Sequence, residues 1–264
     1  MFEFHGDSKR YFDIQVENTR EYVIPFIQQH VDLTKGKRIL EIGCGEAGVL
    51  KAFTNIGCTG VGVELEERRL VNARKWMEEE LNTGKVTLIS KDIYLVNAKE
   101  EFKDCFDVII LKDVIEHIHD HSKLISWMKT FLNPGGVIFF GFPPWHMPFG
   151  GHQQVMQSRF LSRLPYFHLL PFGLYEWILK IMKEDVAQFA EIKETRITIE
   201  RFEKITNQTG YKILKGEHFL FNPIYKYKFK IKPRTQFGLI KRLRYFRNYL
   251  TTCVYYLITP IENK

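Results

Sequence analysis

A glycine-rich hexapeptide, Gly43-Cys44-Gly45-Glu46-Ala47-Gly48, is the most informative short pattern in this chain of 264 residues. Glycine allows a tight turn and a close approach to a ligand, and a helix that begins there offers free N–H groups. Glu64 follows Gly43 by 21 positions, at the end of an apolar stretch. A carboxylate at that spacing can bind both hydroxyls of a ribose. The pattern predicts a site for a cofactor that contains adenosine.

Glu41 helps to choose between two cofactor classes that share this geometry. It stands two residues before Gly43. Beside the pyrophosphate of a nicotinamide or flavin dinucleotide, a carboxylate would face a like charge, which is unfavourable. Beside S-adenosylmethionine it would face an ammonium and a sulfonium. The residue therefore favours S-adenosylmethionine, and a dinucleotide-dependent oxidoreductase is the alternative.

The glycine loop with its neighbours, residues 41–48, resembles the first motif of class I S-adenosylmethionine-dependent methyltransferases. Four later segments are similar to further motifs of that family, in the same order: 61–65, 91–93, 106–117 and 132–136. The segment 106–117 resembles in particular the type 11 and ubiquinone-methyltransferase-like groups. The resemblance implies that S-adenosylmethionine is the cofactor. It also implies these cofactor-binding residues: Glu41, Gly43, Cys44, Gly45, Glu64, Leu65, Asp92, Ile93, Lys112 and Asp113.

Three histidines are the candidates for catalysis. Methyl transfer needs alignment and exclusion of water, and a phenol or alcohol acceptor also benefits from a general base. His117 follows an expected strand at 106–111, and His146 and His152 lie in an aromatic, glycine-rich segment after another at 137–142. Each of them can instead be a structural histidine. The expected reaction is methyl transfer to a small molecule, at oxygen, and a non-catalytic protein that only binds the cofactor is a further alternative.

No metal site is expected. His117, His119 and His121 stand close together in the sequence, but a helix beginning there would turn His119 away from the other two. The four cysteines contain no CxxC pair, which is typical of a reducing compartment rather than of a zinc site or a disulfide framework. The first residues contain no apolar run that resembles a signal peptide. We therefore expect a cytoplasmic protein, with membrane association as an option.

Strands are expected at 37–42, 60–64, 86–89, 106–111 and 137–142, and helical patterns at about 7–30, 49–55 and 66–81. Their alternation predicts an α/β fold that positions these residues. We expect a Rossmann-like, doubly wound, mostly parallel sheet of seven strands with an antiparallel late strand, in one domain over residues 1–264. Residues 143–198 interrupt the regular pattern and are expected to form an inserted lid over the acceptor. Thr198 is expected to cap a following helix. Residues 225–231 alternate in polarity and predict a strand.

The net charge of +7 is unevenly distributed. From residue 212 onward there are twelve Lys and Arg against two Glu, a net of +10, which leaves −3 for the preceding residues. Residues 237–258 show helical spacing of apolar side chains, so we expect a basic amphipathic extension over 237–264. It is predicted to contact a membrane surface, a second subunit or the protein body. No nucleic-acid-binding motif accompanies the charge, so no nucleic-acid partner is expected.

Overall fold

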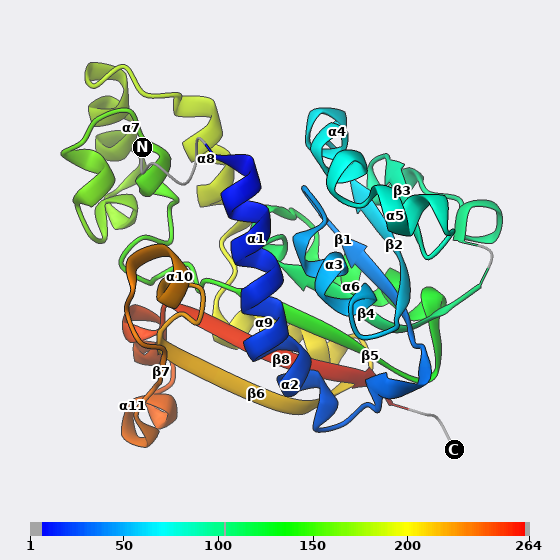
Figure 1. Ribbon diagram of the computed structural model, residues 1–264. Helices are drawn as coiled ribbons and strands as arrows, with labels where there is room; N and C mark the ends of the chain where they lie inside the picture. The colour runs from blue at the N-terminus through cyan, green and yellow to red at the C-terminus, as the bar shows by residue number, and fades with distance from the viewer. Residues whose placement is uncertain (1–6, 103, 262–264) are drawn as a thin grey trace.

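The computed structural model describes residues 7–102 and 104–261 and is built on a mixed sheet of eight strands (Figure 1). Their order across the sheet is β3-β2-β1-β4-β5-β8-β6-β7. The strands are β1 (Arg38–Ile42), β2 (Thr59–Glu64), β3 (Val86–Ser90), β4 (Phe106–Lys112), β5 (Leu132–Phe142), β6 (Tyr211–Phe221), β7 (Arg234–Thr235) and β8 (Cys253–Pro260). The first five pair in parallel, and β8 is antiparallel to β5 and to β6.

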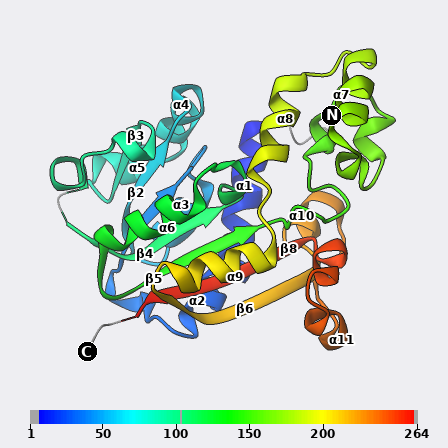
Figure 2. The same cartoon turned by 180° about the vertical axis from the view of Figure 1, so that it is seen from behind.

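Helices cover both faces of the sheet, as a doubly wound fold requires (Figures 1 and 2). On one face lie α1 (Ser8–Asn18), α2 (Ile24–Gln28), α3 (Gly48–Thr54) and α4 (Glu67–Trp76), and on the other lie α6 (His121–Met128) and α9 (Ile199–Gln208). Successive strand residues point to opposite faces. Ile39 and Val108 therefore join the core under the first group, and Leu40 and Ile109 join the core under the second.

The first five strands and the glycine turn are confirmed, and most helix ends agree to within a few residues. The expected N-terminal helix is divided, with a π-helical turn (Thr19–Val23) before α2 and Pro25 in the first turn of α2. The helix expected after β2 is broken at Met77, where α5 (Glu78–Asn82) begins. Thr198 caps α9 as expected, because its side chain accepts a hydrogen bond from the Arg201 N–H.

The number of strands and the form of the C-terminal segment correct the sequence analysis. The sheet has eight strands rather than seven, because the two-residue β7 pairs with β6 at the edge. The helix expected over 237–258 is wrong. Only α11 (Gly238–Arg242) and a 3₁₀ helix (Phe246–Leu250) are helical, and β8 lies inside the sheet between β5 and β6. The segment is therefore not an extension of the domain but completes its sheet; residues 262–264 lie outside the described residues.

The strand expected over 225–231 is also wrong. These residues begin with α10 (Tyr225–Phe229), which ends where Lys230 adopts a left-handed conformation, φ 59°. Tyr225 and Phe229 lie four residues apart, and their ring centroids are 5.3 Å apart on one side of this helical turn. The two rings thus contact each other at helical spacing, whereas the alternating polarity predicted a strand.

Residues 143–198 form a compact layer beyond the ends of the parallel strands (Figure 2). They contain α7 (Phe172–Ile181) and α8 (Val186–Thr195), and they bury a core of their own around Phe167, Tyr175 and Leu179. A role as an acceptor lid stays a prediction. Within the described ranges, no helix has the length and apolar character needed to cross a bilayer.

Candidate functional site

The glycine loop connects β1 to α3 at the carboxyl ends of the parallel strands. Gly43 has φ 69°, and its N–H donates to the Val63 carbonyl at 2.8 Å. A Cβ at Gly43 would lie 2.5 Å from Cγ2 of Val114. Gly45 has φ 55°, and a Cβ there would collide with the Arg69 guanidinium. Gly43 therefore needs glycine for backbone conformation and for space, and Gly45 needs it mainly for its positive φ, because the end of a flexible arginine side chain can move.

Glu64, at the end of β2, holds this loop in place. One carboxylate oxygen accepts from the Gly45 N–H at 2.7 Å, and the other accepts from the Glu66 N–H at 3.0 Å. Each oxygen has two lone pairs, so the carboxylate keeps capacity for two further donors. This is the capacity that two ribose hydroxyls require. Cys44 is buried next to Gly45.

Glu41 is buried in β1 and faces the start of α3. Its Oε2 accepts from the Leu50 N–H at 3.0 Å. Burial raises the pKa of this carboxyl to about 8, although the Leu50 hydrogen bond and the positive charge of Lys112 act in the opposite direction. The first turn of α3 is thus already in contact with a carboxyl group. A helix N-terminus in that state is a poor site for the pyrophosphate of a dinucleotide.

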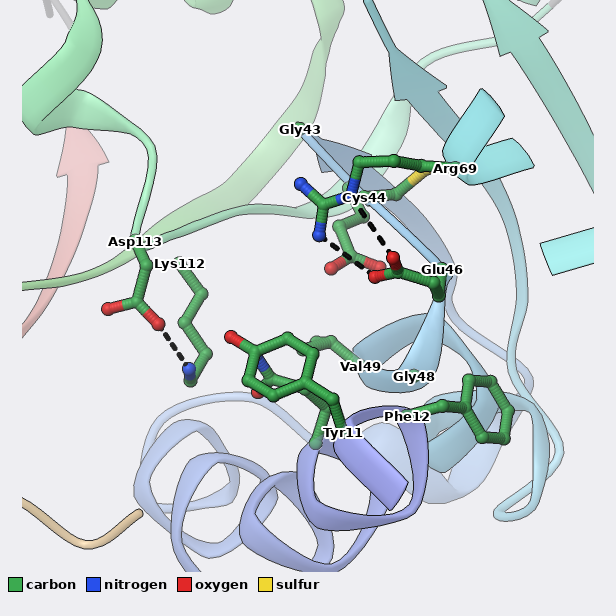
Figure 3. A pocket seen from close by; sticks show the side chains of 12 residues that line it. Tyr11, Phe12, Gly43, Cys44, Glu46, Gly48, Val49, Arg69, Lys112 and Asp113 are labelled. Atoms are coloured by element: carbon green, nitrogen blue, oxygen red, sulfur yellow. Dashed lines mark hydrogen bonds and ion pairs between the residues drawn. The ribbon is translucent and has the colours of Figure 1, made fainter. Parts of the chain in front are cut away.

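A cavity of about 100 Å³ lies beside the loop, lined by Glu41, Gly43, Cys44 and residues of other elements (Figure 3). Arg69 of α4 reaches over the loop and pairs with Glu46 at 2.8 Å. Tyr11 enters from α1, and its hydroxyl accepts from the Gln15 side chain at 2.7 Å. Neither residue belongs to a recognisable motif. They could not be predicted from the sequence, because only the packing of α1 and α4 brings them to the loop.

Lys112 and Asp113 close the far side of this cavity, at the end of β4. Their side chains form an ion pair of 2.6 Å, shown in Figure 3. Asp113 has φ 57°, and its N–H donates to the Gly141 carbonyl at 2.7 Å. Burial alone would raise the pKa of the Asp113 carboxyl, but Lys112 outweighs burial and lowers it. Asp113 is therefore a carboxylate at neutral pH.

The remaining predicted cofactor residues stand on the loops after β2 and β3. Leu65 is 70% exposed and Ile93 is buried. The Asp92 side chain accepts from the Tyr94 N–H at 2.9 Å, which begins a short 3₁₀ turn. An adenine held here would meet one exposed apolar side chain and a carboxylate that already has one donor.

A second cavity, of about 250 Å³, shares Tyr11 and Asp113 with the first. Its apolar lining includes Met147, Phe149 and Ile224. Its other polar and titratable lining residues are Glu116, His152, Gln154, Asn222, Tyr225, Lys228 and Thr252. The two cavities are therefore adjacent, with Tyr11 of the N-terminal helix and Asp113 of the turn after β4 lining both.

His152 and His117 come together in the structure, although 35 positions separate them in the sequence. Their rings meet edge to face with centroids 5.0 Å apart, and His152 Nε2 lies 3.9 Å from Oε1 of Glu116. Burial, and secondarily His117, lowers the pKa of His152 to about 4. Burial, and secondarily Asp113, raises the pKa of Glu116. His152 is therefore a neutral imidazole at neutral pH, and the raised pKa of Glu116 favours the protonated form of its carboxyl group.

His146, the third candidate, lies elsewhere. Its ring packs against Tyr249 at 5.0 Å and lines another cavity with His168 and Arg196. Two of the three predicted histidines are therefore adjacent, and the third is separate. Glu116 and Lys228 line the second cavity and were not named as site residues, because titratable residues of this kind carry no distinguishing sequence signal.

Metal-ligand atoms gather in a group that the sequence analysis did not consider. Glu116, His117 and His152 offer ligand atoms that all lie within 4.8 Å of one another. Among the described residues His119 and His121 do not join them. The His121 ring is buried and contacts the Ile115 carbonyl at 3.0 Å. The group that could hold a metal ion thus combines the turn after β4 with the segment after β5.

Comparisons with known proteins identify the family of the chain and its fold. A family model described as a methyltransferase domain matches residues 16–164, more than half of the chain. The ubiquinone biosynthesis O-methyltransferase of Actinobacillus pleuropneumoniae (serotype 5b, strain L20) is 30% identical over 117 residues, which are 44% of this chain and 50% of that protein. This chain therefore spans about half the length of that relative.

Solved structures show the same fold at low identity. An S-adenosylmethionine-dependent methyltransferase from Clostridium acetobutylicum has a TM-score of 0.56 and 13% identity over 93% of this chain and 92% of that one. Magnesium protoporphyrin IX methyltransferase from Synechocystis PCC 6803, solved with S-adenosylhomocysteine, has a TM-score of 0.54 and 15% identity over 97% of this chain and 88% of that one. These matches decide between the two cofactor classes. The chain belongs to the methyltransferase domain family and has the fold of the class I S-adenosylmethionine-dependent methyltransferases.

Proposed function

We propose that this S-adenosylmethionine-dependent methyltransferase transfers a methyl group to the oxygen of a small-molecule acceptor bound in the second cavity. The adjacency of the two cavities, which share Tyr11 and Asp113 in their linings, carries the proposal. A donor held at the glycine loop and an acceptor in the second cavity would meet there. The named O-methyltransferase relative supports oxygen as the acceptor atom.

The glycine loop and the turns after β2, β3 and β4 would hold the cofactor. Gly43, Cys44 and Gly45 would contact its methionine part, and Lys112 and Asp113 would lie near the same part. Glu64 would accept from the ribose hydroxyls, and Asp92 would accept from the adenine amino group between Leu65 and Ile93. Glu41 would face the ammonium group, directly or through a neighbour. When bound, the cofactor supplies a methyl group already activated on a positively charged sulfur.

His152 would accept the proton of the acceptor hydroxyl. A neutral imidazole can take a proton, and the low pKa of His152 keeps it neutral over the physiological range. Oε1 of Glu116, 3.9 Å from Nε2, lies where it can orient the ring and favour its charged form. The apolar residues Met147 and Phe149 would exclude water from the reacting atoms.

Turnover of a panel of phenols and alcohols tests the proposal, with S-adenosylhomocysteine affinity measured by calorimetry on the same variants. We expect His152→Asn to lower turnover by about 100-fold or more, the range of a lost general base, with cofactor affinity unchanged. His146→Asn is the matched control and should keep turnover. Equal losses of turnover in the two variants would contradict the assignment, as would methylation of amines only.

Treatment with a chelator distinguishes a general base at His152 from a metal ion bound by Glu116, His117 and His152. We expect turnover to be unchanged after dialysis against EDTA, because the proposed step needs only His152 and Glu116. Loss of turnover that returns with a divalent cation would show that Glu116, His117 and His152 act as ligands instead. For residues 237–264, contact with a membrane and contact with a second subunit are both still proposals, although the segment is not the expected helix.

A further inference from the structure

The connection between β6 and β8, residues 222–252, is the most basic part of the chain. Its 31 residues contain nine Lys and Arg and no Asp or Glu. It includes α10, β7 and α11, and in both views α11 projects beyond the end of the sheet (Figures 1 and 2). Because β6 and β8 are fixed in the sheet at both ends, the connection is held against the domain as a defined surface.

This connection exposes large apolar side chains that are not buried in the core of the domain. Leu239 is 72% exposed and Tyr245 is 67% exposed. Others exposed on the same connection are Ile231, Phe237, Leu243 and Phe246. Its buried positions include polar residues that hydrogen-bond to the body, such as Gln236 to the Leu250 carbonyl and Asn248 to Glu200, besides the apolar Ile224. Several large apolar side chains thus point outward, while mainly polar contacts hold the connection against the body.

The nine cations fall into two groups. Four are used within the protein: Lys226 pairs with Glu21, Lys241 with Glu217 and Arg247 with Glu200, and Lys228 lines the second cavity. The other five are exposed: Lys230, Lys232, Arg234, Arg242 and Arg244. Arg234 lies 4.5 Å from the centre of the Phe237 ring, so cationic and apolar groups are interleaved. We call these five cations and six apolar side chains the basic apolar surface.

We propose that the basic apolar surface binds the surface of a lipid bilayer that contains anionic lipids. Exposed cations are attracted to anionic headgroups, and interleaved leucine and aromatic side chains enter the boundary between headgroups and acyl chains. Charge complementarity argues for this occupant, because a surface with five exposed cations and no acid repels a second copy of itself. The apolar side chains argue against nucleic acid, since exposed leucine and isoleucine gain nothing from a phosphate backbone.

The location of this surface is consistent with that partner. Tyr225 and Lys228 of α10 line the second cavity, and the basic apolar surface begins at Lys230, directly after α10. Bilayer binding would therefore place the cavity close to the lipid. This consequence rests on the proposed function, whereas the binding itself does not.

Sedimentation with vesicles tests the proposal on the full chain. We expect binding to vesicles of phosphatidylcholine mixed with phosphatidylglycerol, and much weaker binding to phosphatidylcholine alone. Replacing Lys230, Lys232, Arg242 and Arg244 by Ser should weaken binding by about tenfold or more. The matched control replaces Lys75, Lys85, Lys204 and Lys212 by Ser, four exposed cations elsewhere, with the same change in net charge. It should weaken binding much less.

The apolar contribution is tested separately. The double variant Leu239→Ser with Tyr245→Ser should lower vesicle binding by about tenfold, because two exposed apolar side chains no longer enter the interface. Val71→Ser, at an apolar position of α4 that is 60% exposed, is the control and should bind as the parent does. Circular dichroism checks that every variant is folded.

Four outcomes would overturn the proposal. The first two are equal binding to neutral and anionic vesicles, and equal weakening in the four-cation variant and its control. The third is a concentration-dependent dimer in sedimentation velocity that the Leu239 and Tyr245 variant abolishes, which would assign the surface to a second copy. The fourth is binding to an oligonucleotide with no vesicle binding. A catalytically inactive chain would still bind vesicles, so failure of the proposed methyl transfer is distinguishable from failure here.

Discussion

The Oε2 of Glu41 accepts a hydrogen bond from the Leu50 N–H at 3.0 Å, so a carboxyl group from β1 lies at the start of α3. A helix N-terminus ordinarily attracts anionic ligands. At α3 the carboxyl group of Glu41 occupies the position that such a ligand would take. The contact gives a structural reason why the glycine loop suits a cationic ligand better than a pyrophosphate.

Glu41 should release a proton when the cofactor product binds. Its pKa is raised to about 8, chiefly by burial, so the group is mostly protonated at pH 7. An ammonium placed beside it favours the ionised form, and the proton leaves. Calorimetry of S-adenosylhomocysteine at pH 7 in two buffers of different ionisation enthalpy measures this release. Glu41→Gln should abolish it, and an equal release in that variant would refute the placement.

Gly43→Ala should lower the stability of the protein and its binding of S-adenosylhomocysteine more than Gly84→Ala does, although both glycines have the same φ. Gly43 and Gly84 both have φ 69°, but a Cβ at Gly43 would lie 2.5 Å from Val114, whereas none lies within 4 Å at Gly84. Both variants lose about 1–2 kcal/mol from the left-handed conformation. Only Gly43→Ala adds a clash of about 1–3 kcal/mol. Urea unfolding should show that difference, and only Gly43→Ala should weaken S-adenosylhomocysteine binding. Equal losses of stability would contradict the geometry.

Buried histidines should make the protein sensitive to mild acid. Burial lowers the pKa values of His121 and His168 to about 4, from 6.5. As the pH falls, these histidines take up protons near pH 6.5 in the unfolded chain but only near pH 4 in the folded protein. The stability that they contribute above pH 6.5 is therefore lost as the pH falls toward 4. Between pH 7.5 and pH 5 the loss is about 2 kcal/mol per histidine.

Urea unfolding at the two pH values checks this expectation. The variants His121→Asn and His168→Asn should each reduce the difference in stability between pH 7.5 and pH 5. His30→Asn, at an exposed position, is the control. An undiminished difference in both buried-site variants would exclude these groups as its source.

Two leucines of the segment 237–258, which was expected to be helical, should behave very differently when replaced. Leu257 is fully buried in β8, and Leu239 is 72% exposed in α11. Leu257→Ala should lower the free energy of unfolding by about 2–5 kcal/mol, and Leu239→Ala should change it by less than about 0.5 kcal/mol. Similar effects of the two substitutions in urea unfolding would restore the helical interpretation.

Local patterns determined the first half of the fold. Strands β1 to β5 and the glycine turn follow from short apolar segments and from glycines whose positive φ values only that residue adopts easily. The capping of α9 by Thr198 is equally local. These features depend on neighbours in the chain, so the sequence alone was sufficient to predict them.

The tertiary structure decided the identity of the last long strand. Within β8, Tyr255 and Leu257 join one core, and Val254 and Tyr256 join the other. A strand buried on both faces has no polar alternation, so its apolar residues can match helical spacing by coincidence. Pairing with β5 and β6 resolves the ambiguity, because only neighbouring strands can satisfy its backbone hydrogen bonds in the core.

The candidate site divides in the same way. Spacing identified Gly43, Gly45 and Glu64, since the loop and the end of the next strand are adjacent in any sheet of this topology. Arg69 and the contact between Glu116 and His152 could not be predicted, because each joins segments that only packing brings together. The sequence determined the residues of the proposed cofactor end of the site, and the tertiary structure decided which residues line the proposed acceptor end.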